Sequence, residues 1–197
     1  MTAPEVVPDR IYLLGHSMGG KAAPRIAAAD LSIAGLVMLA ADTQPLHETA
    51  VRVACYLADL ATGPGADEAV STMVRQAASV ADPDLTPDTP SGLLTLGISA
   101  AYWLDLRAYD PVAPGRQTGS PDADPSREEG LPSDRRRRSA RLAARFGGRP
   151  EVTIRIHKDA NHLFFAGSGQ PTPGEYARPG QVDPAVVDEI ATWLARG

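Results

Sequence analysis

The sequence Gly15-His16-Ser17-Met18-Gly19-Gly20 lies between a short apolar run, residues 11–14, and an alanine-rich segment, residues 21–29. The pattern Gly-x-Ser-x-Gly between a buried strand and a helix is typical of a sharp turn that presents a nucleophilic serine. A bare Gly-x-Ser-x-Gly occurs by chance in many proteins. Here the expected strand before the motif and the expected helix after it favour the catalytic interpretation of Ser17.

The residues around Ser17 have distinct expected roles. Gly15 and Gly19 lack a Cβ, so we expect the strand and the helix to approach closely there while Ser17 takes a strained conformation. The turn would point Ser17 Oγ above the sheet. The backbone amide of Met18, near the helix N-terminus, would then face an oxyanion formed at that oxygen.

Length and composition predict one domain with an ordinary core. The chain has 197 residues, of which 43% are hydrophobic and 22% charged. A net charge of -5 argues against nucleic acid as a partner. Cys55 is the one cysteine, which excludes an internal disulfide. No signal peptide and no run of membrane-spanning length is evident, so we expect a cytoplasmic protein with no membrane partner. The sequence leaves the oligomeric state open.

Apolar runs and helical periodicity predict an α/β architecture. The expected elements are strand 10–14, helix 18–29 and strand 33–41, which form a βαβ unit of a parallel sheet. Helices at 45–81 and 93–106 would belong to a helical, lid-like excursion that comprises residues 43–110. A strand at 152–157 and a helix at 184–195 would close the domain, with Val187, Ile190, Ala191 and Leu194 facing inward.

Residues 116–149 are rich in arginine and include Arg135-Arg136-Arg137-Arg138. Such a run is compatible with nucleic-acid binding. The acidic balance of the whole chain favours a solvated, disordered insert instead.

His162 is the candidate general base. It lies in Asp159-Ala160-Asn161-His162-Leu163-Phe164, a loop just after the strand expected to end at His157. A neutral imidazole there would take the Ser17 proton and return it to the leaving group. We expect His157 to be structural, His16 to shape the pocket wall and His47 to lie on the surface. The spacing of the four histidines does not suggest metal ligands, and no metal or cofactor is expected.

From these residues the chain resembles a bacterial family of α/β-hydrolase carboxylesterases. The resemblance covers residues 10–116, including Tyr102-Trp103-Leu104-Asp105-Leu106-Arg107-Ala108-Tyr109-Asp110-Pro111-Val112, and residues 150–193, including Asn161-His162-Leu163-Phe164 and Thr172-Pro173-Gly174-Glu175-Tyr176. It implies a partial α/β-hydrolase fold, a parallel sheet flanked by helices. It also implies Ser17 as nucleophile, His162 as base and short acyl esters as substrates.

Two departures from the family pattern stand out. Members have several strands before the serine turn, one of which leads to a loop that donates the second oxyanion amide; this chain is expected to be truncated there. Members also have a strand reading roughly Pro-Leu-Leu-Val-Leu-Gln-Gly, then Arg-Asp-Tyr-Gln-Val-Thr, whose Asp is the triad acid. Arginine-rich sequence stands in its place here.

A frameshift would explain the second departure. Permitted codons for residues 122–138, read from the second nucleotide, can spell Met-Leu-Ile-Leu-Gln-Gly-Arg-Arg-Asp-Tyr-Gln-Val-Thr-Val-Ala-Asp. The middle bases of the shifted codons were chosen for the match, whereas the protein fixes nearly all the others. We hypothesise a frameshift beginning at 116–121 and ending at 146–149, with the acid encoded across Gly130 and Leu131. An uninterrupted frame in DNA from independent isolates would exclude it.

Asp42 is the candidate substitute acid. It ends the second expected strand, where some hydrolases place their acid, and the other interpretation is a strand-end turn residue. Five other aspartates have weaker claims: Asp110, Asp159, Asp122, Asp124 and Asp134.

The sequence therefore predicts a serine hydrolase of carboxylic esters, a small-molecule substrate and no cofactor. Without a triad acid and half of the oxyanion hole, activity would be very low. The alternatives are a catalytically inactive hydrolase fragment, a non-enzymatic binding protein that uses the arginine run, or, among enzymes, a peptidase or thioesterase.

Overall fold

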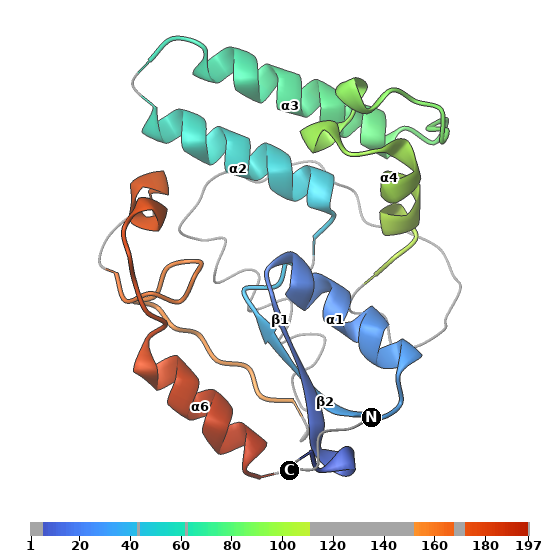
Figure 1. Ribbon diagram of the computed structural model, residues 1–197. Helices are drawn as coiled ribbons and strands as arrows, with labels where there is room; N and C mark the ends of the chain where they lie inside the picture. The colour runs from blue at the N-terminus through green and yellow to red at the C-terminus, as the bar shows by residue number, and fades with distance from the viewer. Residues whose placement is uncertain (1–5, 43, 62, 111–151, 168–171, 197) are drawn as a thin grey trace. The chain divides into compact units, whose positions relative to one another are not determined.

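The computed structural model describes residues 6–42, 44–61, 63–110, 152–167 and 172–196. The chain divides into two compact units (Figure 1). Residues 6–41, 152–167 and 172–196 belong to the first, called the sheet unit below, and the described residues of 42–110 belong to the second, called the helical unit. The single domain expected from the chain length remains a prediction. In the described part of the chain, no helix is both long and apolar enough to span a membrane.

Two parallel strands form the centre of the sheet unit. After a short 3-10 turn, η1 (Pro8–Arg10), β1 (Ile11–His16) pairs with β2 (Ile33–Leu39), and α1 (Met18–Ala29) connects them. The predicted strand, helix, strand order is confirmed for these elements. The amides and carbonyls of a strand need partners. The parallel ladder pairs β1 with β2 as far as His16, two residues beyond the predicted strand end.

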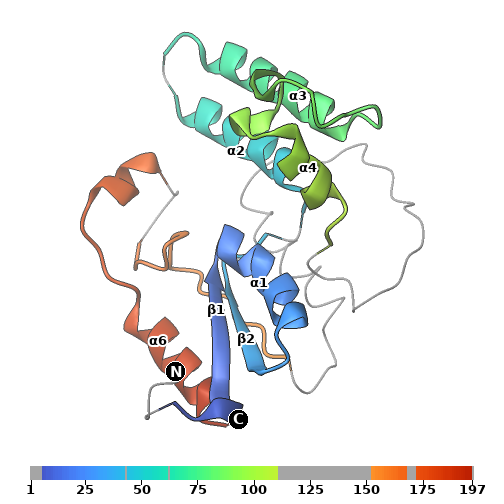
Figure 2. The ribbon, with the colours of Figure 1, turned by 45° about the vertical axis from the view of Figure 1, so that its right-hand side comes forward.

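Helices α1 and α6 (Pro184–Leu194) lie on opposite sides of the two strands (Figures 1 and 2). The ring of Trp193 in α6 packs edge-on against Tyr12 of β1, with ring centroids 5.6 Å apart. Val186 lies two helical turns earlier on the same face and is fully buried, whereas Val187 is 51% exposed. The predicted helix is confirmed. Of its predicted inward residues, Ile190 and Leu194 are half-buried, whereas Val187 and Ala191 are exposed.

The strand predicted at residues 152–157 is not a strand in this structure. The apolar alternation is present, but within the described residues no neighbouring strand pairs with this segment, and a strand requires such pairing. Isolated bridges occur later, between Ala160 and Ala166 and between Phe165 and Val182. A further 3-10 helix, η4 (Pro173–Ala177), follows in the sequence.

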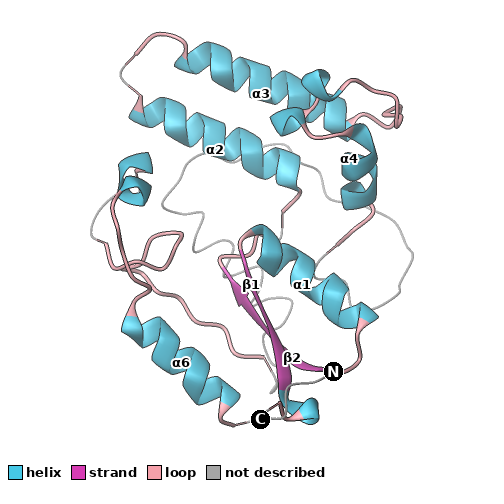
Figure 3. Ribbon diagram, viewed as in Figure 1, coloured by secondary structure: helices cyan, strands magenta, loops and turns pink. Residues whose placement is uncertain are grey.

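The helical unit contains α2 (Leu46–Leu60) and α3 (Ala66–Ala81), which pack side by side (Figure 3). The single helix predicted over 45–81 is therefore two helices. The sequence Gly63-Pro64-Gly65 separates them, and Gly65 precedes α3 with a φ of 100° that favours glycine. A proline and a left-handed glycine both interrupt helical hydrogen bonding.

The predicted helix 93–106 is also shorter than expected. Its first part consists of two 3-10 turns, η2 (Ser91–Leu93) and η3 (Thr95–Gly97), and only α4 (Ala100–Arg107) is α-helical. Ser99 caps α4 by accepting a hydrogen bond from the Tyr102 amide. The core of this unit consists of Val80, Leu85, Leu94, Ala100 and Trp103.

Candidate active site

Ser17 occupies the turn between β1 and α1 and has a backbone conformation that is unusual for a residue with a Cβ. Its φ is 55° and its ψ is -117°. Its amide donates to the Leu39 carbonyl at 2.8 Å, and its carbonyl accepts from the Lys21 amide at 3.0 Å, the first turn of α1. Hydrogen bonds from both sides therefore stabilise a conformation that costs about 1–3 kcal/mol.

Glycines make this turn possible, although one of the two predicted positions was wrong. A Cβ on Gly15 would overlap the Gly19 carbonyl and lie 2.7 Å from the Gly20 amide, so Gly15 is required as predicted. A Cβ on Gly19 would meet nothing within 4 Å. Gly20 has the role expected of Gly19, because its Cβ would lie 2.9 Å from the Gly15 carbonyl oxygen in β1 and 2.8 Å from the Cβ of Ala41.

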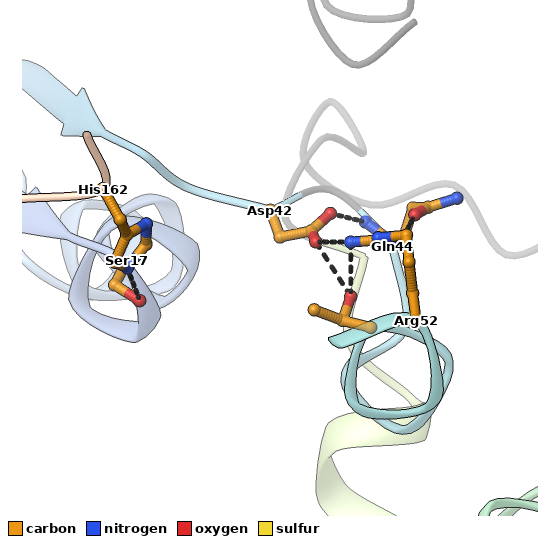
Figure 4. Close-up of polar contacts among 6 residues, drawn as sticks. Ser17, Asp42, Gln44, Arg52 and His162 are labelled. Atoms are coloured by element: carbon orange, nitrogen blue, oxygen red, sulfur yellow. Dashed lines mark hydrogen bonds and ion pairs between the residues drawn. The ribbon is translucent and has the colours of Figure 1, made fainter. Parts of the chain in front are cut away.

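The structure brings Ser17 and His162 together from positions 145 residues apart in the sequence. His162 Nε2 lies 3.1 Å from Ser17 Oγ, within hydrogen-bond distance (Figure 4). A hydroxyl and an imidazole in this contact can exchange a proton.

His16 lies beside this pair. Its Nε2 is 2.8 Å from the carbonyl oxygen of His162, and the centroids of the two rings are 4.9 Å apart. The Phe164 ring also lies edge-on to His16, with centroids 6.3 Å apart. The His16 ring therefore contacts both the backbone carbonyl and the ring of His162, the candidate base. This position is more specific than the pocket wall predicted from the sequence.

Asp42 lies in the helical unit, and its carboxylate has several partners (Figure 4). One oxygen accepts the Gln44 amide at 2.9 Å, and the other accepts the Thr49 hydroxyl at 2.8 Å and the Arg52 guanidinium at 2.6 Å. These contacts match the interpretation of Asp42 as a turn residue. Its role as the acid of a triad remains a prediction.

The other predicted site residues have the following positions. Met18 is the first residue of α1, as the oxyanion prediction requires. His157 Nε2 lies 3.6 Å from the Glu189 carboxylate, which fits its predicted structural role. His47 was predicted to lie on the surface, but it is half-buried and packs edge-on against Trp103 with centroids 6.1 Å apart.

Some predictions concern parts of the chain outside the described residues. These are the disordered insert at 116–149, its arginine run, the hypothesised frameshift, and Asp122, Asp124 and Asp134. Among the described residues, no three or more His, Cys, Asp or Glu side chains are grouped as metal ligands would be.

Comparison with known proteins finds similarity to a curated esterase. The chain is 30% identical over 188 residues to Esterase EstD of Thermotoga maritima. The match includes 95% of this chain but 43% of the relative, so the chain spans less than half the length of that protein. No family model and no solved structure matches. The chain is thus similar in sequence to part of an esterase.

Proposed function

We propose that this chain is the nucleophile-bearing part of an α/β-hydrolase-type serine esterase. The contact between Ser17 Oγ and His162 Nε2, at a strand-to-helix turn, is the observation that supports this most directly. The similarity to an esterase over nearly the whole chain supports the ester as substrate. The chain would act on small carboxylic esters without a cofactor.

The proposed reaction proceeds through an acyl intermediate on Ser17. His162 Nε2 accepts the hydroxyl proton while Ser17 Oγ attacks the ester carbonyl carbon. The carbonyl oxygen becomes an oxyanion that accepts a hydrogen bond from the Met18 amide. His162 returns the proton to the departing alcohol. Water then attacks the acyl-enzyme while His162 takes its proton, and His162 returns that proton to Ser17 Oγ as the acid is released.

Asp42 is the carboxylate that we propose to test as the acid of this site. In a triad, an acid orients the histidine and stabilises its protonated form, and its loss lowers kcat by about 10⁴. Asp42→Asn keeps one acceptor for the Thr49 hydroxyl and removes the charge beside Arg52. A loss of about 10⁴ in kcat, with folding unchanged by circular dichroism, would support the catalytic role. A loss below about tenfold would leave Asp42 as a turn residue.

Hydrolysis of p-nitrophenyl acetate tests the proposed function. We expect slow wild-type hydrolysis above the buffer blank, reduced to the blank by Ser17→Ala and strongly reduced by His162→Ala. Ser32→Ala is the matched control, because Ser32 is an exposed serine of the same unit that contacts Asp30. Parallel assays with an amide and a thioester would separate esterase from peptidase and thioesterase activity. Wild-type activity equal to that of Ser17→Ala would contradict the proposal and favour an inactive fragment.

A further inference from the structure

The side chain of His162 is exposed, so burial does not fix its position. Its position depends on the loop that contains it, and that loop is closed by backbone hydrogen bonds. The Asn161 amide donates to the Phe165 carbonyl and the Phe164 amide donates to the Asn161 carbonyl, both at 3.0 Å. Phe164 has a φ of 60°, an uncommon value for a residue with a Cβ. A tight turn of this kind needs support to persist.

The side chain of Asn161 gives that support from inside the loop. Its Oδ1 accepts two backbone amides, those of Leu163 at 2.9 Å and Phe165 at 3.1 Å. His162 lies between Asn161 and Leu163 in the sequence, so these bonds fix the backbone on either side of it. An Asn or Asp side chain that bonds to its own following backbone stabilises turns in this way.

Glu175 fixes the orientation of the Asn161 amide group. Asn161 Nδ2 donates to Glu175 Oε2 at 3.2 Å. The other oxygen of Glu175 accepts the Thr172 amide at 3.3 Å, within the capping box at the start of η4. With the Nδ2 group directed at a carboxylate, Oδ1 is directed at the two loop amides. The position needs a donor and an acceptor on one short side chain, which asparagine provides.

We propose that Asn161, oriented by Glu175, is a positioning residue that holds His162 within reach of Ser17. The proposal rests on the proposed function and deepens it. It also gives a physical reason why the two motifs of the family resemblance, Asn161–Phe164 and Thr172–Tyr176, occur in one chain. Asn161 of the first motif is hydrogen-bonded to Glu175 of the second. Displacement of a catalytic group by about 1 Å can cost about 10² in rate.

Kinetics of p-nitrophenyl acetate hydrolysis give the first test. Asn161→Ala removes three hydrogen bonds, and we expect kcat to fall about 10²-fold while KM changes little. Asn161→Asp keeps the one oxygen that accepts both loop amides but places a carboxylate against Glu175, so we expect a comparable loss. Adding Glu175→Gln restores a donor to this contact, now on residue 175. We expect the double variant to recover to within about fivefold of wild type.

Controls separate a positioning effect from a general loss of structure. Asp30→Ala removes another side-chain acceptor of backbone amides in the same unit, from the exposed turn at Ser32, and should leave kcat unchanged. Glu175→Gln alone should lower kcat, since it weakens the same contact. Failure of the double variant to recover above Asn161→Asp, with both folded by circular dichroism, would overturn the proposal.

A second measurement does not require activity. The NMR shifts of the His162 ring should change in Ser17→Ala, because its Nε2 contacts the Ser17 hydroxyl. In the Asn161→Ala background, the same Ser17→Ala change should leave the ring shifts unaltered. A ring response of wild-type size in that background would overturn the positioning role. Absence of wild-type hydrolysis with a response lost in Asn161→Ala would contradict the proposed function and support the positioning role.

Discussion

The two units of this chain are stabilised in different ways. Among the described residues, the helical unit has most of the buried apolar side chains, including Trp103, Leu94 and Val80. The sheet unit has fewer and smaller ones, namely Ala23, Ala160 and Val186. Its distinctive contacts are instead close backbone approaches at Gly15 and hydrogen bonds around His162.

The comparison shows that side-chain volume has opposite effects on stability in the two units. The helical unit depends on large side chains that fill a core. The turn at Ser17 depends on the absence of side-chain atoms at Gly15 and Gly20, where backbone occupies the space. Mutations that remove atoms should therefore damage the first unit most, and mutations that add atoms should damage the second.

Trp103→Ala is expected to have the largest effect on stability. Trp103 is 1% exposed and lies in the core of the helical unit, so its removal leaves a cavity. We expect the free energy of unfolding to fall by about 3–5 kcal/mol in urea denaturation. The neighbouring Tyr102 is 40% exposed, and Tyr102→Ala is the control, with a much smaller expected loss. Equal losses for both variants would contradict the assignment of the core.

Gly15→Ala is expected to have the next largest effect. The added Cβ would overlap the Gly19 carbonyl, so strand and helix must move apart, at a cost of about 1–3 kcal/mol. Gly19→Ala is the matched control, since its Cβ meets nothing within 4 Å. In a helix this change should stabilise the protein by about 0.5–1 kcal/mol. Thermal denaturation that ranks the two variants in the reverse order would refute the close-approach account.

Thr95→Val is expected to have the smallest effect and to be stabilising. Thr95 is fully buried, and its hydroxyl has no hydrogen-bond partner among the described residues. An unpaired buried polar group costs about 1–3 kcal/mol, and valine has a similar shape without that group. We expect the free energy of unfolding to rise by about 1 kcal/mol. A decrease would mean that the hydroxyl has a stabilising partner after all.

The sequence predicted local features better than pairings between distant segments. The strand, turn and helix around Ser17 follow from apolar runs and glycines within twenty residues, and His162 follows from its place in a distinctive loop. Residues 152–157 have a strand-like pattern, but a strand needs a partner that no local pattern supplies. The choice of Val186 over Val187 as the buried residue of α6 depends on where Trp193 meets Tyr12.

The contact between Asn161 and Glu175 was missed for the same reason. Both residues lie in the two motifs of the second block of family resemblance, and that shared block is the signal in the sequence that could have linked them. Their hydrogen bond joins residues 14 positions apart, and only the three-dimensional structure shows it. That Gly20 and not Gly19 is the required glycine likewise depends on a residue distant in the sequence, because a Cβ on Gly20 would meet Ala41.

Covalent labelling with a fluorophosphonate tests most directly whether Ser17 is activated by His162. The probe reacts with a serine hydroxyl made nucleophilic by a neighbouring base, so a slow turnover does not prevent detection. We predict that peptide mapping finds the label on Ser17 and that His162→Ala lowers the labelling rate at least 10²-fold. Labelling on another serine, or an unchanged rate in His162→Ala, would contradict the account.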